Sequence, residues 1–288
     1  MGHGLSSAAV ELRATTVEDL PELQELFLSA IGSVYTPHGF APPVPPPGAF
    51  AAQHRHLLGT DPDRCFVALR RSRRVGYVAA WLRGNDWFLG SLFVDPSAHG
   101  AGVGSRLLEA VWGQGNLRRR TLTDAIQPIS NAMYARRGLF PATPLLSFAG
   151  KPTGAECPLT AAPVAGIAEI DEAAYGFDRT VDHRLWGEIA ERTTWLRDGR
   201  VVAYSYRFPS GAVGPVAGLD PEAAAAALAG ELARATGTVS VRIPGSSRTL
   251  VACALAAGLR LSPTPGLLLL SEGVPPPTSL AIGSYTLF

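Results

Sequence analysis

Residues 88–111 read FLGSLFVDPSAHGAGVGSRLLEAV and divide into a strand, a breaker, a glycine-rich turn and a helix. The run of Phe, Leu and Val that stops at Asp95-Pro96 predicts a buried strand. In residues 103–111 the apolar side chains fall on one face at 3.6 residues per turn, which predicts a helix. The stretch therefore predicts a strand–turn–helix unit with glycines at its corner.

The glycine turn has the properties of an anion-binding site. Gly100, Gly102 and Gly104 allow the backbone to come close to a ligand and to point successive N–H groups outward. Those groups and the positive end of the helix dipole favour a phosphate. The turn lacks the Gly-Lys-Ser/Thr of nucleoside triphosphate sites, and its spacing does not match the dinucleotide pattern G-x-G-x-x-G. A plain corner between strand and helix is the structural alternative.

His99-x-x-Gly102-x-Gly104 resembles motif A of the GNAT acetyltransferase superfamily, commonly written Gln/Arg-x-x-Gly-x-Gly/Ala. His99 stands where Gln or Arg is usual. The resemblance implies that the loop amides bind the pyrophosphate of acetyl-CoA and that the preceding strand pairs with the pantetheine arm. The cofactor contacts implied in this way are Leu92, Phe93, Val94, His99, Gly100, Ala101, Gly102, Val103, Gly104 and Ser105.

A second motif follows after one strand. Residues 128–140 read PISNAMYARRGLF, which predicts a helix ended by Gly138. The segment resembles GNAT motif B, in which a Tyr four residues before Gly-Phe lies near the thioester. The resemblance implies that Tyr134 is the catalytic residue and that Gln127 and Asn131 contact the cofactor, although Gln127 stands where Asn is common and Leu139 where Phe is. Two such motifs in the expected order identify the first half as a GNAT domain.

The remainder of the chain repeats the pattern of the first half. Residues 194–206 parallel the hairpin at 66–78, and residues 212–221 parallel 89–96. We therefore expect an α/β (α+β) fold of two tandem GNAT-like lobes, each a mixed, largely antiparallel sheet flanked by helices. The expected boundaries are residues 1–150 for the acetyl-CoA-binding GNAT domain and 151–288 for a degenerate GNAT-like domain that is structural or shapes the acceptor site.

The second copy has lost the glycine turn. Asp220 and Pro221 predict a capped helix start, and Glu222 with the alanines of 223–227 stands where the first copy has glycines. Two carboxylates there would repel a pyrophosphate, and the helix that matches motif B has no Tyr at the corresponding place. We expect no CoA site in the second lobe.

Composition excludes several classes of protein. The chain has 288 residues with 47% hydrophobic residues, so two ordinary domains are possible, and no run of 18 apolar residues suggests a membrane span. Residues 1–7 lack the features of a signal peptide, so a cytoplasmic protein is expected. A net charge of +1 gives no case for binding nucleic acid or a membrane. Cys65, Cys157 and Cys253 indicate reduced thiols, and no metal site is expected, since His54 and His56 lack a third ligand.

Two segments remain open to more than one interpretation. The proline-rich residues 35–48 predict either a stiff surface loop or a wall of the acceptor pocket. The charged residues of 177–184 predict a solvated helix face, ion pairs between lobes, or a recognition surface.

The expected reaction is direct transfer of the acetyl group of acetyl-CoA to a primary amine of a small molecule or peptide, by a monomer or homodimer. A phenol, with a pKa of about 10, stays protonated at neutral pH, so Tyr134 can protonate the leaving thiolate. Candidates for the base are Asp86, Asp124, Glu25 and the carboxylate at Phe288. The alternative function is a non-catalytic, regulatory acyl-CoA-binding module.

Overall fold

The computed structural model describes residues 9–163 and 166–288. These residues form two compact units. The first takes in residues 9–82 and 89–116, and the second takes in residues 83–88 and the described residues from 117 to 288. Residues 1–8 lie outside the described residues, and with them the segment 1–7 on which the signal-peptide expectation rests.

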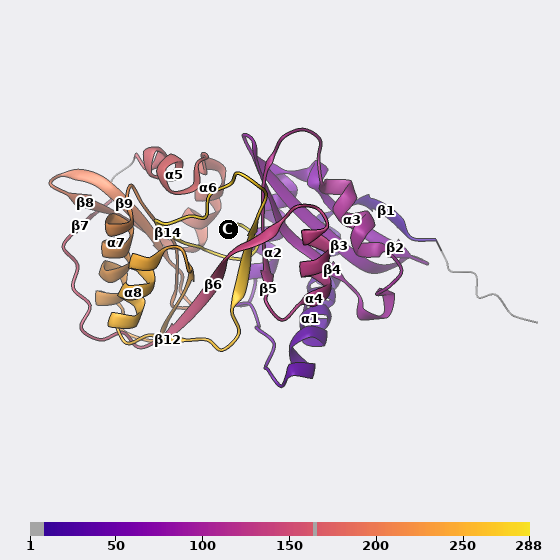
Figure 1. Cartoon of the computed structure of the whole chain (residues 1–288), viewed down its shortest axis with the longest axis horizontal. Coiled ribbons are helices and arrows are strands. Elements are labelled where there is room, and N and C mark those ends of the chain that lie inside the picture. The colour runs from indigo at the N-terminus through magenta and orange to yellow at the C-terminus, as the bar shows by residue number, and fades with distance from the viewer. Residues whose placement is uncertain (1–8, 164–165) are drawn as a thin grey trace, which may run out of the picture. The chain divides into compact units, whose positions relative to one another are not determined.

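The first unit holds the elements of the predicted strand–turn–helix stretch (Figure 1). Its elements are β1 (Glu11–Ala14), α1 (Leu20–Tyr35), α2 (Ala49–Thr60), β2 (Cys65–Arg70), β3 (Arg73–Arg83), β4 (Asp86–Val94) and α3 (Val103–Val111), with short 3-10 turns before α1 and between elements; the end of β3 and the start of β4 belong to the second unit. The strand order is β1-β2-β3-β4, and β2 pairs antiparallel with both β1 and β3. The hairpin predicted from the sequence is confirmed.

Helix α3 packs closely on this sheet. Its apolar face, Val103, Leu107, Leu108 and Val111, is buried as the 3.6-residue period predicts. A Cβ atom at Gly76 of β3 would lie 2.7 Å from the Leu107 side chain, so the glycine allows the helix to approach the strand. Val103, the first residue of the helix, lies close as well, because the same Cβ atom would be 3.0 Å from its side chain.

The second unit has the larger sheet. Its elements are β5 (Arg118–Asp124), α4 (Pro128–Ala135), β6 (Phe140–Gly150), β7 (Thr160–Ala162), α5 (Ala168–Tyr175), α6 (Thr180–Ile189), β8 (Glu191–Arg197), β9 (Arg200–Arg207), β10 (Ala212–Gly218), α7 (Pro221–Ala233), β11 (Val239–Pro244), α8 (Arg248–Ala256), β12 (Arg260–Leu261), β13 (Gly266–Leu270) and β14 (Leu280–Ala281). The strand order is β5-β13-β6-β11-β10-β9-β8-β7, with β12 beside β6 and β14 beside β10. Apart from the parallel pair β10–β11, the pairings with a defined register are antiparallel. The predicted mixed, largely antiparallel fold class is confirmed.

Strands from before and after residue 150 interleave in this sheet. Strand β13 lies between β5 and β6, because Gly266 pairs with Asp124 on one side and Leu145 on the other. Strand β6 continues past β13 and pairs with β11. One compact unit therefore holds strands from both sides of residue 150. The domain boundary at residue 150, which was drawn from the sequence repeat, stays a prediction.

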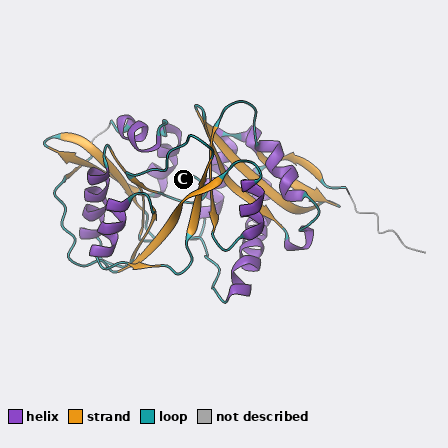
Figure 2. Ribbon diagram, in the orientation of Figure 1, coloured by secondary structure: helices purple, strands orange, loops and turns teal. Residues whose placement is uncertain are grey.

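Helices α7 and α8 lie side by side and cover one face of β6, β10 and β11 (Figures 1 and 2). Three alanines of α7, at 223, 224 and 227, are fully buried in this core, where small side chains permit close approach. Gly230 of α7 has no room for a side chain, because a Cβ atom there would overlap the ring of Trp195.

The charged segment 177–184 contains two buried charges, Arg179 and Asp182, while Asp178 and Arg184 are exposed. The guanidinium of Arg179 is fully buried and lies 4.5 Å from the ring centres of both Tyr175 and Trp186. It donates to the carboxylate of Asp182, which also accepts from Arg83 at 2.9 Å. Buried charges are stable only when paired in this way. The expectation of a solvated helix face is therefore wrong for Arg179 and Asp182.

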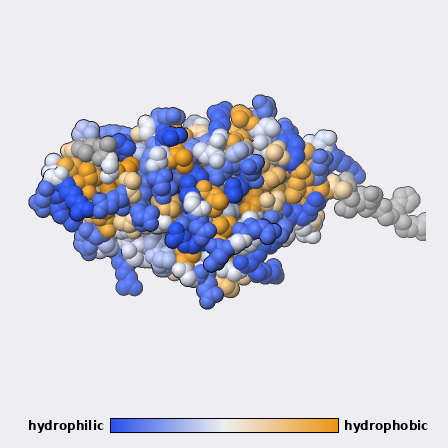
Figure 3. Space-filling model, turned by 90° about the horizontal axis from the view of Figure 1, so that it is seen from above, coloured by the Kyte–Doolittle hydropathy of each residue, from blue (hydrophilic) through white to orange (hydrophobic). Residues whose placement is uncertain are grey.

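No helix among residues 9–163 and 166–288 is long and apolar enough to cross a membrane. On the face shown in Figure 3, hydrophilic side chains cover much of the surface and apolar residues appear in scattered areas.

Two glycines inside helices should respond in opposite directions to alanine. A Cβ atom placed at Gly32 of α1 would have no neighbour within 4 Å, so Gly32→Ala should stabilise the protein by about 0.5–1 kcal/mol. Gly230→Ala should destabilise it by about 1–3 kcal/mol, because the methyl group meets Trp195. Differential scanning calorimetry of both variants checks the prediction, and shifts of the same sign would contradict it.

Candidate functional site

The turn between β4 and α3 is open to solvent. Gly100 and Gly102 adopt φ of 77° and 74°, and no atom lies within 4 Å of a Cβ placed at either residue. The left-handed backbone therefore requires glycine here, and the space beside it is free to admit a ligand. Of the residues implied as cofactor contacts, Leu92, Phe93, Val94 and Gly104 are half-buried, Val103 is buried, and His99, Gly100, Ala101, Gly102 and Ser105 are exposed.

The start of α3 carries unused hydrogen-bond donors. Gly102 occupies the N-cap position, no side chain caps the helix, and no acidic residue lies in its first turn. Within residues 9–163 and 166–288, none of the backbone N–H groups of 100–105 donates to another group of the protein. Such a row of N–H groups at the positive end of a helix binds anions.

The side chain of His99 forms a hydrogen bond with the last residue of β4. Its Nε2 donates to the carbonyl oxygen of Val94 at 3.1 Å, so the imidazole ties the turn to the end of β4. The bond leaves the backbone N–H groups of the turn available. Its predicted contact with the cofactor stays a prediction.

His54 of α2 is a buried packing residue that contacts Ser91 of β4. Its Nδ1 donates to the carbonyl oxygen of Phe50 at 2.7 Å, and its Nε2 accepts from the Ser91 hydroxyl at 3.0 Å. The ring stacks on Phe50 at 3.9 Å and meets Tyr77 edge-on at 5.3 Å. Burial lowers the pKa of His54 to about 4, which keeps the imidazole neutral at physiological pH.

In the second unit, Tyr134 lies on α4 with 4% of its surface exposed. Burial raises the pKa of its phenol, and a hydrogen bond with Ser130 acts in the opposite direction. The helix ends as predicted, because Gly138 adopts φ of 78° and the Leu139 N–H donates to the carbonyl oxygen of Tyr134 at 3.1 Å. The phenol is thus held protonated on a defined turn of helix.

The two other predicted residues of this unit lie at the start of α4. Asn131 donates to the carbonyl oxygens of Asp124 and Ala125 at 3.3 and 3.4 Å, while its own Oδ1 is buried without a hydrogen-bond partner among the described residues. A buried acceptor of this kind suits an amide N–H group such as those of pantetheine. Gln127 is half-buried at the N-cap of α4. The predicted cofactor residues therefore fall in both units, with motif A in the first and the α4 residues in the second.

The candidate bases differ in their surroundings. Asp86 is fully buried and paired with exposed Arg118 and buried Arg120, so its carboxylate serves to neutralise these two guanidinium groups. Burial lowers the pKa of Arg120 to about 10, below the ordinary value of an arginine. Glu25 is exposed, and half-buried Asp124 lies 3.5 Å from the Tyr285 hydroxyl. Asp86 is therefore poorly placed to accept a proton from a substrate.

Phe288 is buried as well. Its carbonyl oxygen accepts from Arg179 at 2.7 Å, and its ring stacks on Phe88 at 5.4 Å. The residue packs inside the second unit through both its backbone and its side chain.

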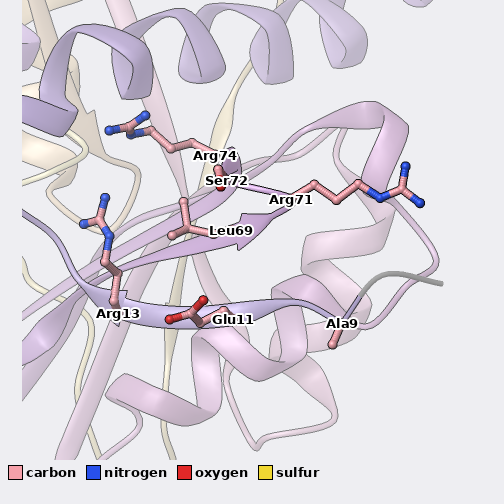
Figure 4. A pocket seen from close by; sticks show the side chains of 7 residues that line it. All are labelled: Ala9, Glu11, Arg13, Leu69, Arg71, Ser72 and Arg74. Atoms are coloured by element: carbon pink, nitrogen blue, oxygen red, sulfur yellow. The ribbon is translucent and has the colours of Figure 1, made fainter. Parts of the chain in front are cut away.

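A hollow of about 470 Å³ on the first unit is lined by three arginines (Figure 4). Arg13 and Arg74 line it, and both donate to the buried carboxylate of Asp19 at 2.7 Å. Arg71 also lines the hollow but extends away from the other side chains (Figure 4). Two of its three arginines are thus already neutralised. No group of His, Cys, Asp or Glu suited to a metal ion occurs in the part of the chain that the structure describes.

Comparison with known proteins agrees with this geometry. Residues 61–138, which contain both motifs, match the family model described as an acetyltransferase (GNAT) domain. Residues 61–138 thus have the sequence of a GNAT acetyltransferase domain. Over 112 residues it is 34% identical to the mycothiol acetyltransferase of Rhodococcus jostii (strain RHA1), an alignment that covers 38% of this chain and 34% of that relative. The chain thus spans about a third of the length of the curated relative it matches.

Solved structures extend the likeness of fold to nearly the whole chain. A putative acetyltransferase from Pyrococcus horikoshii has a TM-score of 0.76 and 16% identity, with 99% of this chain and 98% of that chain covered. A tandem GNAT protein from the clavulanic acid biosynthesis pathway has a TM-score of 0.55 and 13% identity, with 93% and 100% covered. The tandem GNAT arrangement predicted from the sequence is confirmed at the level of the fold.

The second GNAT-like lobe uses its own side chains at the helix start. The carboxylate of Asp220 accepts from the N–H of Ala223 at 2.6 Å, and Pro221 and Glu222 occupy the first turn of α7. The predicted cap is confirmed. The helix that corresponds to α3 in the repeat thus has a built-in acceptor where α3 has open glycines.

The second lobe also fills the space between its parallel strands. Strands β10 and β11 pair only at their beginnings, and β14 lies beside the rest of β10. Ser279 accepts from the N–H of Gly218 at 3.1 Å, and Ile282 donates to the carbonyl oxygen of Arg242 on β11 at 2.9 Å. This insertion was not predicted from the sequence, because a two-residue strand after three prolines has no periodicity to find.

The buried His54 should make stability depend on pH. Its pKa of about 4 lies below the ordinary 6.5, so stability is complete above pH 6.5 and falls as the pH drops toward 4. The loss amounts to about 3 kcal/mol at most. Thermal unfolding from pH 7 to pH 4 should therefore show a smaller decline in His54→Gln than in the wild type.

His38→Gln, at an exposed side chain of the same unit, serves as the control and should keep the wild-type decline. Equal declines in wild type and His54→Gln would show that the imidazole does not couple protonation to folding.

Proposed function

We propose that the protein is an acetyl-CoA-dependent N-acetyltransferase that transfers the acetyl group to a primary amine of a small molecule or peptide. The observation that carries the proposal is the match of residues 61–138 to a GNAT domain, with an uncapped glycine turn at motif A. The name of the matched relative shows that acetyl transfer occurs among proteins with sequences similar to this segment.

The cofactor would bind through residues of this chain at two places. The N–H groups of 100–105 have no acceptor within the described residues and suit the pyrophosphate. Leu92, Phe93 and Val94 would pair with the pantetheine arm, and the unpartnered Oδ1 of Asn131 suits one of its amides. Acetyl-CoA supplies the reactive thioester, and Gln127 and Asn131 would orient it.

Tyr134 would act as the general acid. The amine nitrogen forms a bond to the thioester carbonyl carbon and loses a proton to water. The C–S bond then breaks, so the departing sulfur needs a proton. Burial raises the pKa of Tyr134, so the phenol carries its proton when the C–S bond breaks. The proposal thus gives Tyr134 a chemical role beyond helix packing.

The second lobe would bind no acetyl-CoA and would serve as a structural or acceptor-shaping domain. Asp220 already satisfies the start of α7, and residues 279–282 occupy the space beside β10. Release of free thiol from acetyl-CoA with a panel of amines tests the whole proposal. Binding of acetyl-CoA without thiol release from any amine would leave a non-catalytic binding module instead.

The glycine turn should be essential for binding acetyl-CoA. Gly102→Glu places bulk and a negative charge where the pyrophosphate would lie, so affinity for acetyl-CoA should fall at least a hundredfold, equivalent to about 2.7 kcal/mol. Isothermal titration calorimetry should give one site per chain in the wild type and none in the variant.

Gly39→Glu is a matched control, because Gly39 has φ of 75° with open space beside it in the same unit. It imposes the same backbone strain and should leave binding unchanged. Two equivalent sites in the wild type, or unchanged affinity in Gly102→Glu, would contradict the proposal.

Removal of the Tyr134 hydroxyl should slow the reaction without weakening the binding of acetyl-CoA. Tyr134→Phe keeps the ring but removes the proton, and loss of one acid–base group typically costs ~10²–10⁴ in rate. We expect kcat to fall at least about a hundredfold while the Kd for acetyl-CoA stays nearly constant.

Tyr77→Phe is the control, because Tyr77 is buried and its hydroxyl has no hydrogen-bond partner among the described residues. Its kcat should match the wild type. Nearly full kcat in Tyr134→Phe would make Tyr134 a packing residue.

A further inference from the structure

One face of the sheet in the second unit carries a polar groove that the proposed acetyl transfer does not use. Strand β6 pairs with β11 on one side and β12 on the other. Arg242 is opposite Ser147, and both Ser240 and Arg260 are opposite Ala149. Directly paired residues share a face of an antiparallel sheet, and so do residues two apart along a strand. These side chains therefore lie on one face.

The opposite face of the same strands is the buried one. Phe148 and Val241, which alternate with the groove residues, belong to the core beneath α7 and α8. The groove face thus points away from those helices. Alternation along β6 and β11 explains why small polar residues occupy it.

The groove is small, with a volume of about 220 Å³. Besides Arg242 and Arg260, its lining consists of four short side chains, called its floor (Ser147, Ala149, Ser240 and Ser262), and of Phe148, Val241 and Leu261. Ligand clefts that hold drug-sized molecules measure about 300–1,000 Å³. A small molecule or one charged group of a larger molecule suits this space.

Two cations flank the floor without a counter-ion. Neither Arg242 nor Arg260 forms an ion pair with any residue that the structure describes, and no carboxylate among the described residues lines the groove. The guanidinium of Arg242 lies 5.9 Å from the ring centre of Tyr285, which supports it without neutralising it. Other arginines of this unit, such as Arg179 and Arg207, are paired with carboxylates.

We propose that this groove binds a small anionic ligand whose phosphate or carboxylate group is held by Arg242 and Arg260. The planar guanidinium presents paired N–H donors that match the oxygens of either anion. The serine hydroxyls of the floor add donors between the two arginines. The second unit then has a ligand of its own, at a place other than the start of α7.

Binding can be measured without turnover. Isothermal titration calorimetry in about 0.15 M NaCl, with CoA present to occupy the glycine turn, would use glycerol 3-phosphate for the phosphate source and succinate for the carboxylate source. Glycerol is the neutral control. We expect at least one of the two anions to bind with one site per chain, and glycerol not to bind.

Substitutions of groove residues test whether the anion binds at this place. Arg242→Gln and Arg260→Gln should each weaken that affinity at least tenfold, and Ser240→Glu should abolish binding by placing a carboxylate on the floor. Arg242→Lys should bind with intermediate affinity, because it keeps the charge but not the paired donors. Arg248→Gln, at an exposed arginine on α8, is the matched control and should bind as the wild type does.

Two outcomes would overturn the inference: neither anion binds, or the affinity survives both Arg242→Gln and Arg260→Gln. Both readouts are independent of acetyl transfer, so failure of the proposed function would appear separately, as absence of thiol release.

Discussion

The backbone N–H groups at the start of a helix need hydrogen-bond acceptors, and the two lobes meet this need in different ways. At α3 the turn consists of glycines with left-handed φ and no side chain caps the helix, so the acceptor must come from solvent or a ligand. At α7 the carboxylate of Asp220 accepts from Ala223 and completes the helix start. One constraint thus distinguishes a helix start that is left uncapped from a helix start that is capped by its own side chain.

The same demand for satisfied polar groups shapes the rest of the second unit. Beyond the short parallel pairing of β10 with β11, the chain inserts residues 279–282 as a strand that takes up the hydrogen bonds of β10. In the interior, Asp182 is bound by Arg179 and Arg83. Asn131 Oδ1 and the guanidinium of Arg242 have no such partner among the described residues, and the two proposals above assign a ligand to each.

Local signals made much of the fold predictable. The apolar period of α3, the cap at Asp220 and the glycine that ends α4 each depend on residues within one or two turns, and all three are confirmed. The order of the two motifs likewise predicted the GNAT domain. The burial of Arg179 and the place of β13 between β5 and β6 were not predictable, because both depend on partners more than a hundred residues away in the chain. For the candidate site, the sequence located the glycine turn and Tyr134, whereas the unpartnered Oδ1 of Asn131 emerged only from the packed structure.

The central claim is that only the uncapped glycine turn of the first lobe binds acetyl-CoA. Hydrogen–deuterium exchange measured by mass spectrometry, with and without CoA, tests it most directly, because the ligand would engage the N–H groups themselves. The account predicts that CoA slows exchange in residues 100–105 and leaves residues 221–227 of α7 unchanged. Slowed exchange at the start of α7, or no change at the glycine turn under saturating CoA, would contradict it.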